Sequence, residues 1–134
     1  GPRKSVLKSK SKLKTNQEFK THTIQVMTLF PNTVLVAHHE HVEVWHILPG
    51  NKENESKVSF SLFSIEKATT KSAKQHWENN FNLAIDVVQA EDFPLGEDVQ
   101  KGFYADQKRE LIFGKNEPGL QHFHKSINQA LKDG

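Results

Sequence analysis

The chain has 134 residues, enough for one globular domain of ordinary size and too few for two. It has no apolar run near the roughly 18 residues that a membrane-spanning helix needs, so we expect a cytoplasmic protein without a membrane anchor. It also has no cysteine, which excludes disulfides, thiolate catalysis and cysteine-ligated iron–sulfur clusters from this chain. Any metal must be held by His, Asp or Glu.

The net charge of +2 is unevenly distributed. Positive charge is concentrated in residues 1–20, where Lys and Arg face only Glu18, and the remainder is mildly acidic. A Lys/Ser-rich stretch of this kind could serve as a nucleic-acid tail. Residues 4–14, however, contain no aromatic side chain for base stacking and no Arg for bidentate contacts. We therefore interpret residues 1–20 as a flexible basic segment or loop and expect no nucleic-acid partner.

The first half of the chain has strand patterning. Residues 21–30 alternate apolar and polar side chains, with Ile24, Val26 and Phe30 at a period of two, and Pro31-Asn32 marks a turn. A long second strand is expected over residues 33–48, ending at Pro49-Gly50. The polar residues 51–56 form a connection to a third strand at residues 57–65. The pattern predicts an antiparallel meander.

Four histidines fall on the second of these strands: His38, His39, His41 and His46. Side chains two residues apart share one face of a strand, so His39 and His41 could meet one metal ion. The alternative is that they are surface or pocket-edge residues.

The apolar period changes to that of helices in the second half. Between residues 72 and 89, Trp77, Phe81, Ile85 and Val88 form one stripe of an amphipathic helix. Pro94 and Gly96 are expected to interrupt the helix, with a short helical segment at residues 97–103 and a brief strand at 111–113. A turn at Gly114 and a last helix from Pro118 complete the chain. The fold class is therefore α+β, an antiparallel sheet covered by C-terminal helices.

Asp92 stands out because it continues the apolar stripe of the first helix. A carboxylate on a buried face is strongly disfavoured unless a cation, a metal or several donors compensate it. Glu97 and Gln100, which are three residues apart as neighbours on a helix are, follow it and are candidate hydrogen-bond partners that would orient such a ligand. Alternatively, Asp92 caps the next helical segment, or Pro94 ends the helix early and leaves the carboxylate exposed.

A set of residues in this region resembles a known family. The ordered motif consists of Glu91-Asp92, Glu97, Gln100, Gly102, Gly114, Glu117 and Phe123-His124. It is similar to the carboxy-terminal signature of the large (alpha) subunits of Rieske-type, non-haem iron aromatic-ring-hydroxylating dioxygenases. The sequence LFPN at residues 29–32 is also similar to the family, so the resemblance spans roughly residues 21–131.

The resemblance implies that residues 21–134 are the C-terminal part of a catalytic domain with a helix-grip (START-like) fold, incomplete in this chain. It implies a mononuclear iron(II) held by two His and one Asp, with Asp92 as the carboxylate ligand. Glu97 and Gln100 would support that ligand. Phe81, Ile85 and Val88 would line the substrate pocket.

In the family, the two His ligands come from an upstream segment and the Rieske [2Fe–2S] cluster from a separate domain. Neither is in this sequence, so we expect the chain alone to be inactive. The implied partners of the parent are an aromatic or similar organic substrate, dioxygen, and a reductase or ferredoxin that donates electrons, and the parent would be a homotrimer. The alternative function is a small helix-grip protein that binds an apolar ligand without metal.

Overall fold

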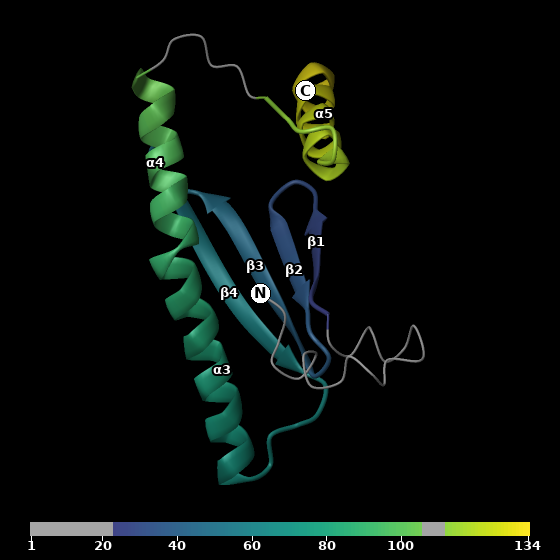
Figure 1. The fold of residues 1–134 in the computed structure, drawn as a ribbon, viewed down its shortest axis with the longest axis vertical. Coiled ribbons are helices and arrows are strands. Elements are labelled where there is room, and N and C mark those ends of the chain that lie inside the picture. The colour runs from purple at the N-terminus through teal and green to yellow at the C-terminus, as the bar shows by residue number, and fades with distance from the viewer. Residues whose placement is uncertain (1–22, 106–111) are drawn as a thin grey trace. The chain divides into compact units, whose positions relative to one another are not determined.

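A computed structural model describes residues 23–105 and 112–134 and has an α+β architecture (Figure 1). The elements are β1 (Gln25–Leu29), β2 (Thr33–Ala37), β3 (His41–Pro49), β4 (Ser56–Ser64), α3 (Lys71–Ala90), α4 (Asp92–Ala105) and α5 (Pro118–Asp133). The sequence-based fold class, an antiparallel sheet followed by helices in the manner of a helix-grip fold, is confirmed. The basic segment expected at residues 1–20 lies outside the described residues, as does Leu111 at the start of the strand expected at 111–113.

The four strands form one antiparallel meander in the order β1-β2-β3-β4. The predicted turn at Pro31-Asn32 joins β1 to β2, and the polar stretch after Pro49 joins β3 to β4. In the second connection the Gly50 amide donates to the Glu55 carbonyl at 2.8 Å. A side chain at Gly50 would collide with the β-carbon and backbone of Glu55, so this close approach requires glycine.

The single long strand predicted over residues 33–48 is wrong, because the chain reverses in its middle. The amide of His38 donates to the carbonyl of His41 at 2.9 Å, and Ala37 pairs with Val42. His39 and Glu40 are therefore a two-residue hairpin loop between β2 and β3. The turn contains none of the residues that are typical of turns (Gly, Pro, Asn or Asp), and the strand pattern continues on both of its sides.

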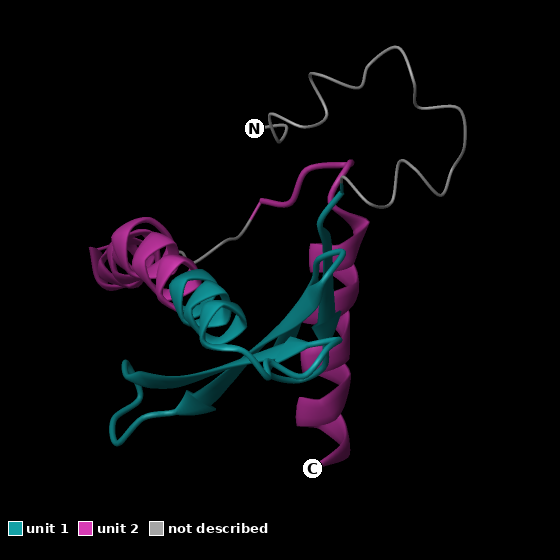
Figure 2. Cartoon of the chain, turned by 90° about the horizontal axis from the view of Figure 1, so that it is seen from below, with its two compact units in different colours: residues 1–81 teal, residues 82–134 magenta. Residues whose placement is uncertain are grey.

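The chain divides into two compact units, residues 1–81 and 82–134, with the boundary inside α3 (Figure 2). In the first unit, the N-terminal half of α3 packs on the sheet through aromatic rings. Phe60 of β4 stacks on Trp45 of β3 with ring centroids 4.2 Å apart, and contacts Phe81 of α3 at 4.8 Å. Among the described residues, Trp45 is the only apolar residue that is buried, at 8% exposed.

The helical stripe predicted for residues 72–89 is confirmed by the exposure of α3. Trp77, Phe81, Ile85 and Val88 are all half-buried, whereas most of their neighbours along the helix are exposed. The periodicity of four, four and three therefore identified the covered face of this helix.

The predicted break between the first two helices is displaced. Only Glu91 separates α3 from α4, and α4 continues through Pro94 and Gly96 instead of starting near Glu97. Pro94 is the third residue of α4, where the missing amide proton removes no hydrogen bond, because the first amides of a helix have no partner within it. The two residues expected to interrupt the helix are thus tolerated in its first turns.

The second unit also contains α5, which begins at Pro118 as predicted. The Gly114 turn precedes it: the Glu117 amide donates to the Gly114 carbonyl at 3.1 Å, and the Glu117 carboxylate accepts from the Gly114 amide at 2.6 Å. Ile112 and Phe113 are not in a strand, contrary to the sequence prediction.

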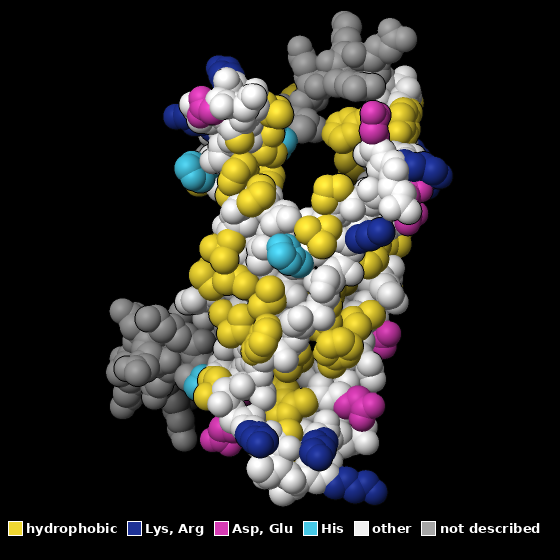
Figure 3. Space-filling view, turned by 180° about the vertical axis from the view of Figure 1, so that it is seen from behind, with side chains coloured by type: hydrophobic (Ala, Val, Ile, Leu, Met, Phe, Trp, Pro, Cys, Tyr) yellow, Lys and Arg dark blue, Asp and Glu magenta, His cyan; other side chains and the backbone are white. Residues whose placement is uncertain are grey.

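Apolar side chains reach the surface over much of the face drawn in Figure 3. On β1, for example, Val26 is 66% and Leu29 53% exposed. None of the helices in the described part of the chain combines the length and hydropathy required to cross a bilayer.

Candidate metal site

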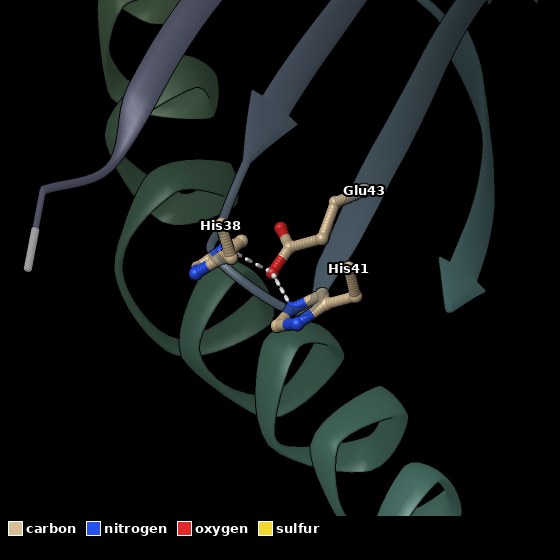
Figure 4. A group of neighbouring side chains, drawn as sticks. All are labelled: His38, His41 and Glu43. Atoms are coloured by element: carbon tan, nitrogen blue, oxygen red, sulfur yellow. Dashed lines mark ion pairs between the residues drawn. The ribbon is translucent and has the colours of Figure 1, made fainter. Parts of the chain in front are cut away.

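Two imidazoles and one carboxylate converge at the end of the β2–β3 hairpin (Figure 4). The Nε2 atom of His38 lies 2.9 Å from Oε1 of Glu43, and Nε2 of His41 lies 3.5 Å from the same oxygen. One potential ligand atom from each residue falls within 4.8 Å of the others. We call these three residues the His-His-Glu cluster.

Hairpin register explains why these residues meet. His38 and His41 flank the two-residue loop and lie opposite one another, while Glu43 follows His41 on the same face of β3. Glu43 pairs with Val36, the residue two positions before His38 on the same face. The cluster therefore occupies two successive positions of one face of the ladder, where side chains are close neighbours.

The cluster is largely shielded from solvent. The side chains of His38, His41 and Glu43 are only 11%, 10% and 12% exposed. The second carboxylate oxygen of Glu43, Oε2, accepts a hydrogen bond of 3.1 Å from the indole Nε1 of Trp45. This bond orients the carboxylate and leaves Oε1 facing the imidazoles. A carboxylate so little exposed requires a compensating cation or several donors.

The two imidazoles stack on each other, and a tryptophan contacts one of them. The rings of His38 and His41 stack with centroids 4.1 Å apart and an interplanar angle of 11°, and the edge of Trp77 from α3 contacts His41 at 5.5 Å. Trp77 also lines a pocket of about 460 Å³, together with His39, Glu40, Ile65, Glu66 and His76. Four of its six lining residues have charged or imidazole side chains.

The structure does not bring together His39 and His41, which the sequence suggested could bind one metal ion. His39 is exposed in the hairpin loop and lines the pocket, and His38 takes its place beside His41. The error follows from the missed turn, because spacing by two identifies a shared face only within one continuous strand. His46 is exposed on β3 and takes no part in the cluster.

Asp92 is the first residue of α4 and is exposed, so the expectation that it continues the buried face of the first helix is wrong and the alternative of an exposed carboxylate at the start of the next helix holds. Its negative charge lies where the helix dipole favours an anion. Glu97 is exposed and Gln100 half-buried on the same helix. Within its own unit, among the described residues, Asp92 belongs to no group of three potential metal ligands.

The residues expected to line a substrate pocket all lie on the covered stripe of α3. Phe81 belongs to the first unit and contacts Phe60, whereas Ile85 and Val88 belong to the second unit. All three are half-buried.

Comparison with known proteins assigns the family. The profile described as "Ring hydroxylating alpha subunit (catalytic domain)" matches residues 3–133, almost the whole chain. Searches of curated proteins and of solved structures gave no match. The profile match and the ordered motif from Glu91-Asp92 to Phe123-His124 agree with the four-stranded antiparallel sheet and the helices that follow it. The chain belongs to the family of ring-hydroxylating oxygenase alpha-subunit catalytic domains.

Proposed function

We propose that this chain is the C-terminal part of an oxygenase catalytic domain, and that the intact enzyme inserts oxygen from dioxygen into an aromatic or similar organic substrate. The observation that carries the proposal is the family match over residues 3–133, which includes the motif around Asp92. The parent enzyme would use a mononuclear iron(II) and receive electrons through a Rieske cluster from a reductase or ferredoxin. We further propose that it works in the cytoplasm as a homotrimer.

In this proposal the Asp92 carboxylate is one of three protein ligands of the iron. A carboxylate oxygen is a suitable ligand for iron(II), and a set of two imidazoles and one carboxylate leaves positions open for other ligands. Asp92 is exposed at the start of α4, so its oxygens are accessible to a metal brought by histidines from elsewhere in the domain. When bound, the iron would supply the activation of dioxygen beside the substrate.

The other proposed residues would orient the ligand carboxylate or bind the substrate. Glu97 and Gln100 follow Asp92 by five and eight residues on the same helix, α4. Their side chains would hold the ligand carboxylate or its neighbours in place by hydrogen bonds. Phe81, Ile85 and Val88 share the covered stripe of α3 and would offer the substrate an apolar surface from which water is excluded.

The test is the iron content and turnover of the native oxygenase that contains this chain, with Asp92→Ala and a matched control, Asp86→Ala. Asp86 is an exposed aspartate on α3, outside the covered stripe. Loss of a ligand should lower the iron retained after purification by more than about tenfold, since even outer hydrogen-bond partners of ligands cost about 10- to 100-fold in affinity. Turnover should fall with the iron.

The control variant should keep both iron and turnover. If Asp92→Ala retains iron and activity as well as Asp86→Ala does, the ligand assignment is wrong. If the wild-type protein holds no iron but binds apolar compounds, the alternative of a metal-free binding protein replaces the oxygenase proposal.

A further inference from the structure

We propose that His38, His41 and Glu43 form a binding site for a divalent transition-metal ion of the zinc class. This His-His-Glu cluster lies entirely within the β2–β3 hairpin of the first unit, and Asp92 takes no part in it. The proposal goes beyond the oxygenase function and does not depend on it.

The spacing of the ligand atoms is the first argument. In a tetrahedral zinc site with ligand bonds of 2.0–2.1 Å, neighbouring ligand atoms lie about 3.3 Å apart. The distances from Glu43 Oε1 to Nε2 of His38 and of His41 are 2.9 and 3.5 Å, one slightly below and one slightly above this value. One potential ligand atom from each of the three residues lies within 4.8 Å of the others, so small rotations of the side chains would place a metal ion at bonding distance from all three.

The orientation of the carboxylate is the second argument. Trp45, which is 8% exposed, donates its indole proton to Oε2 of Glu43. Oε1 is thereby left pointing at the two imidazoles. Carboxylates that bind a metal are themselves usually hydrogen-bonded, and this hydrogen bond comes from a buried residue of the neighbouring ladder position.

The convergence of both imidazoles on one oxygen is the third argument. Their Nε2 atoms lie 2.9 and 3.5 Å from Oε1 of Glu43, and the two rings stack with centroids 4.1 Å apart. Three potential ligand atoms thus face one centre among side chains that are only 10–12% exposed, and a divalent cation there would compensate the poorly exposed carboxylate.

The donor set selects the ion. Two imidazole nitrogens and one carboxylate oxygen suit zinc and its neighbours in the first transition series, with a water molecule as the fourth ligand. Calcium and magnesium prefer sites made of oxygen ligands. Zn²⁺, and Co²⁺ as its spectroscopic substitute, are therefore the ions to test.

The experiment titrates metal-free protein with Zn²⁺ by calorimetry and with Co²⁺ by visible absorption, and measures the thermal unfolding midpoint with and without Zn²⁺. It uses the Asp92→Ala background, so that the proposed iron ligand cannot account for binding. The ligand variants are His41→Ala and Glu43→Gln. The matched controls are His39→Ala, one loop position away, and His46→Ala, an exposed histidine on the same strand.

We expect one Zn²⁺ per chain, a tetrahedral Co²⁺ spectrum, and an increase in the unfolding midpoint with Zn²⁺. Both ligand variants should weaken binding by at least about 100-fold, and Trp45→Phe, which keeps an aromatic ring but removes the orienting hydrogen bond, by about 10-fold. The controls should bind as before, and Mg²⁺ should not compete.

Each variant is compared with itself in the presence and absence of Zn²⁺, so a change in basal stability does not affect the outcome. The proposal is overturned if His39→Ala lowers affinity as much as His41→Ala does. It is also overturned if the unmutated cluster shows no Zn²⁺-dependent increase in the midpoint at millimolar metal.

Discussion

Replacing Phe60 by Leu should destabilise the first unit by breaking the aromatic contact between the sheet and α3. Phe60 stacks on Trp45 with centroids 4.2 Å apart and meets Phe81 at 4.8 Å. Leucine keeps most of the apolar area, so the main loss is the two ring–ring interactions. At about 0.5 to 1.5 kcal/mol each, they predict a loss of about 1 to 3 kcal/mol in the free energy of unfolding.

The assay is urea unfolding followed by tryptophan fluorescence, with Phe63→Leu as the matched control. Phe63 lies on the same strand but on the opposite face and is 60% exposed, so its replacement should change the free energy by less than about 0.5 kcal/mol. With an m value of about 1.5 kcal/mol/M, the expected loss for Phe60→Leu lowers the midpoint by roughly 0.7 to 2 M. Equal midpoints for the two variants would refute the reasoning.

A double-mutant cycle isolates the contact with the helix. If the Phe60–Phe81 pair holds α3 on the sheet, Phe60→Leu and Phe81→Leu should have a coupling energy of about 0.5 to 1.5 kcal/mol. Additive effects would mean that the two rings contribute independently and that the helix is held by other contacts.

Two further predictions concern local structure. Gly50→Ala should lower the free energy of unfolding by about 1 to 3 kcal/mol, because the added carbon collides with Glu55; chemical denaturation measures it, and an unchanged midpoint would contradict the close approach. Asp98→Asn should lower the pKa of Lys101, which is raised mainly by the hydrogen bond that its ammonium donates to the Asp98 carboxylate at 2.8 Å. NMR titration of the lysine side chain measures this shift. Any stability from this pair is present while Lys101 is protonated and is lost as the pH rises through its raised pKa.

Much of the fold could be predicted from the sequence because its apolar periods are regular. Alternation by two identified the extended segments of the sheet, though not the reversal between β2 and β3, and the stripe from Trp77 to Val88 identified the covered face of α3. The break between α3 and α4 was predicted too late in the chain, because Pro94 was interpreted as the end of the first helix. Proline stops a helix only where its missing amide would have been bonded, and the first turn is the exception.

The His-His-Glu cluster could not be identified correctly, because it depends on pairing across a turn. Strand spacing alone suggested His39 with His41, whereas the hairpin places His38 opposite His41. The loop residues His39 and Glu40 have none of the backbone preferences that usually mark a two-residue turn. The ligand role proposed for Asp92 comes from the motif alone, since its position at the start of α4 has a sufficient local explanation in the helix dipole.

The length of the two-residue loop between β2 and β3 is more strictly constrained than the identity of its two residues. Substituting His39 or Glu40 leaves the ladder intact, but inserting or deleting one residue there changes the parity of everything that follows. Glu43 and Trp45 would then turn to the opposite face, and the aromatic packing would be lost together with the cluster. Relatives that retain the His-His-Glu cluster should therefore differ in the amino acids of this loop but not in its length.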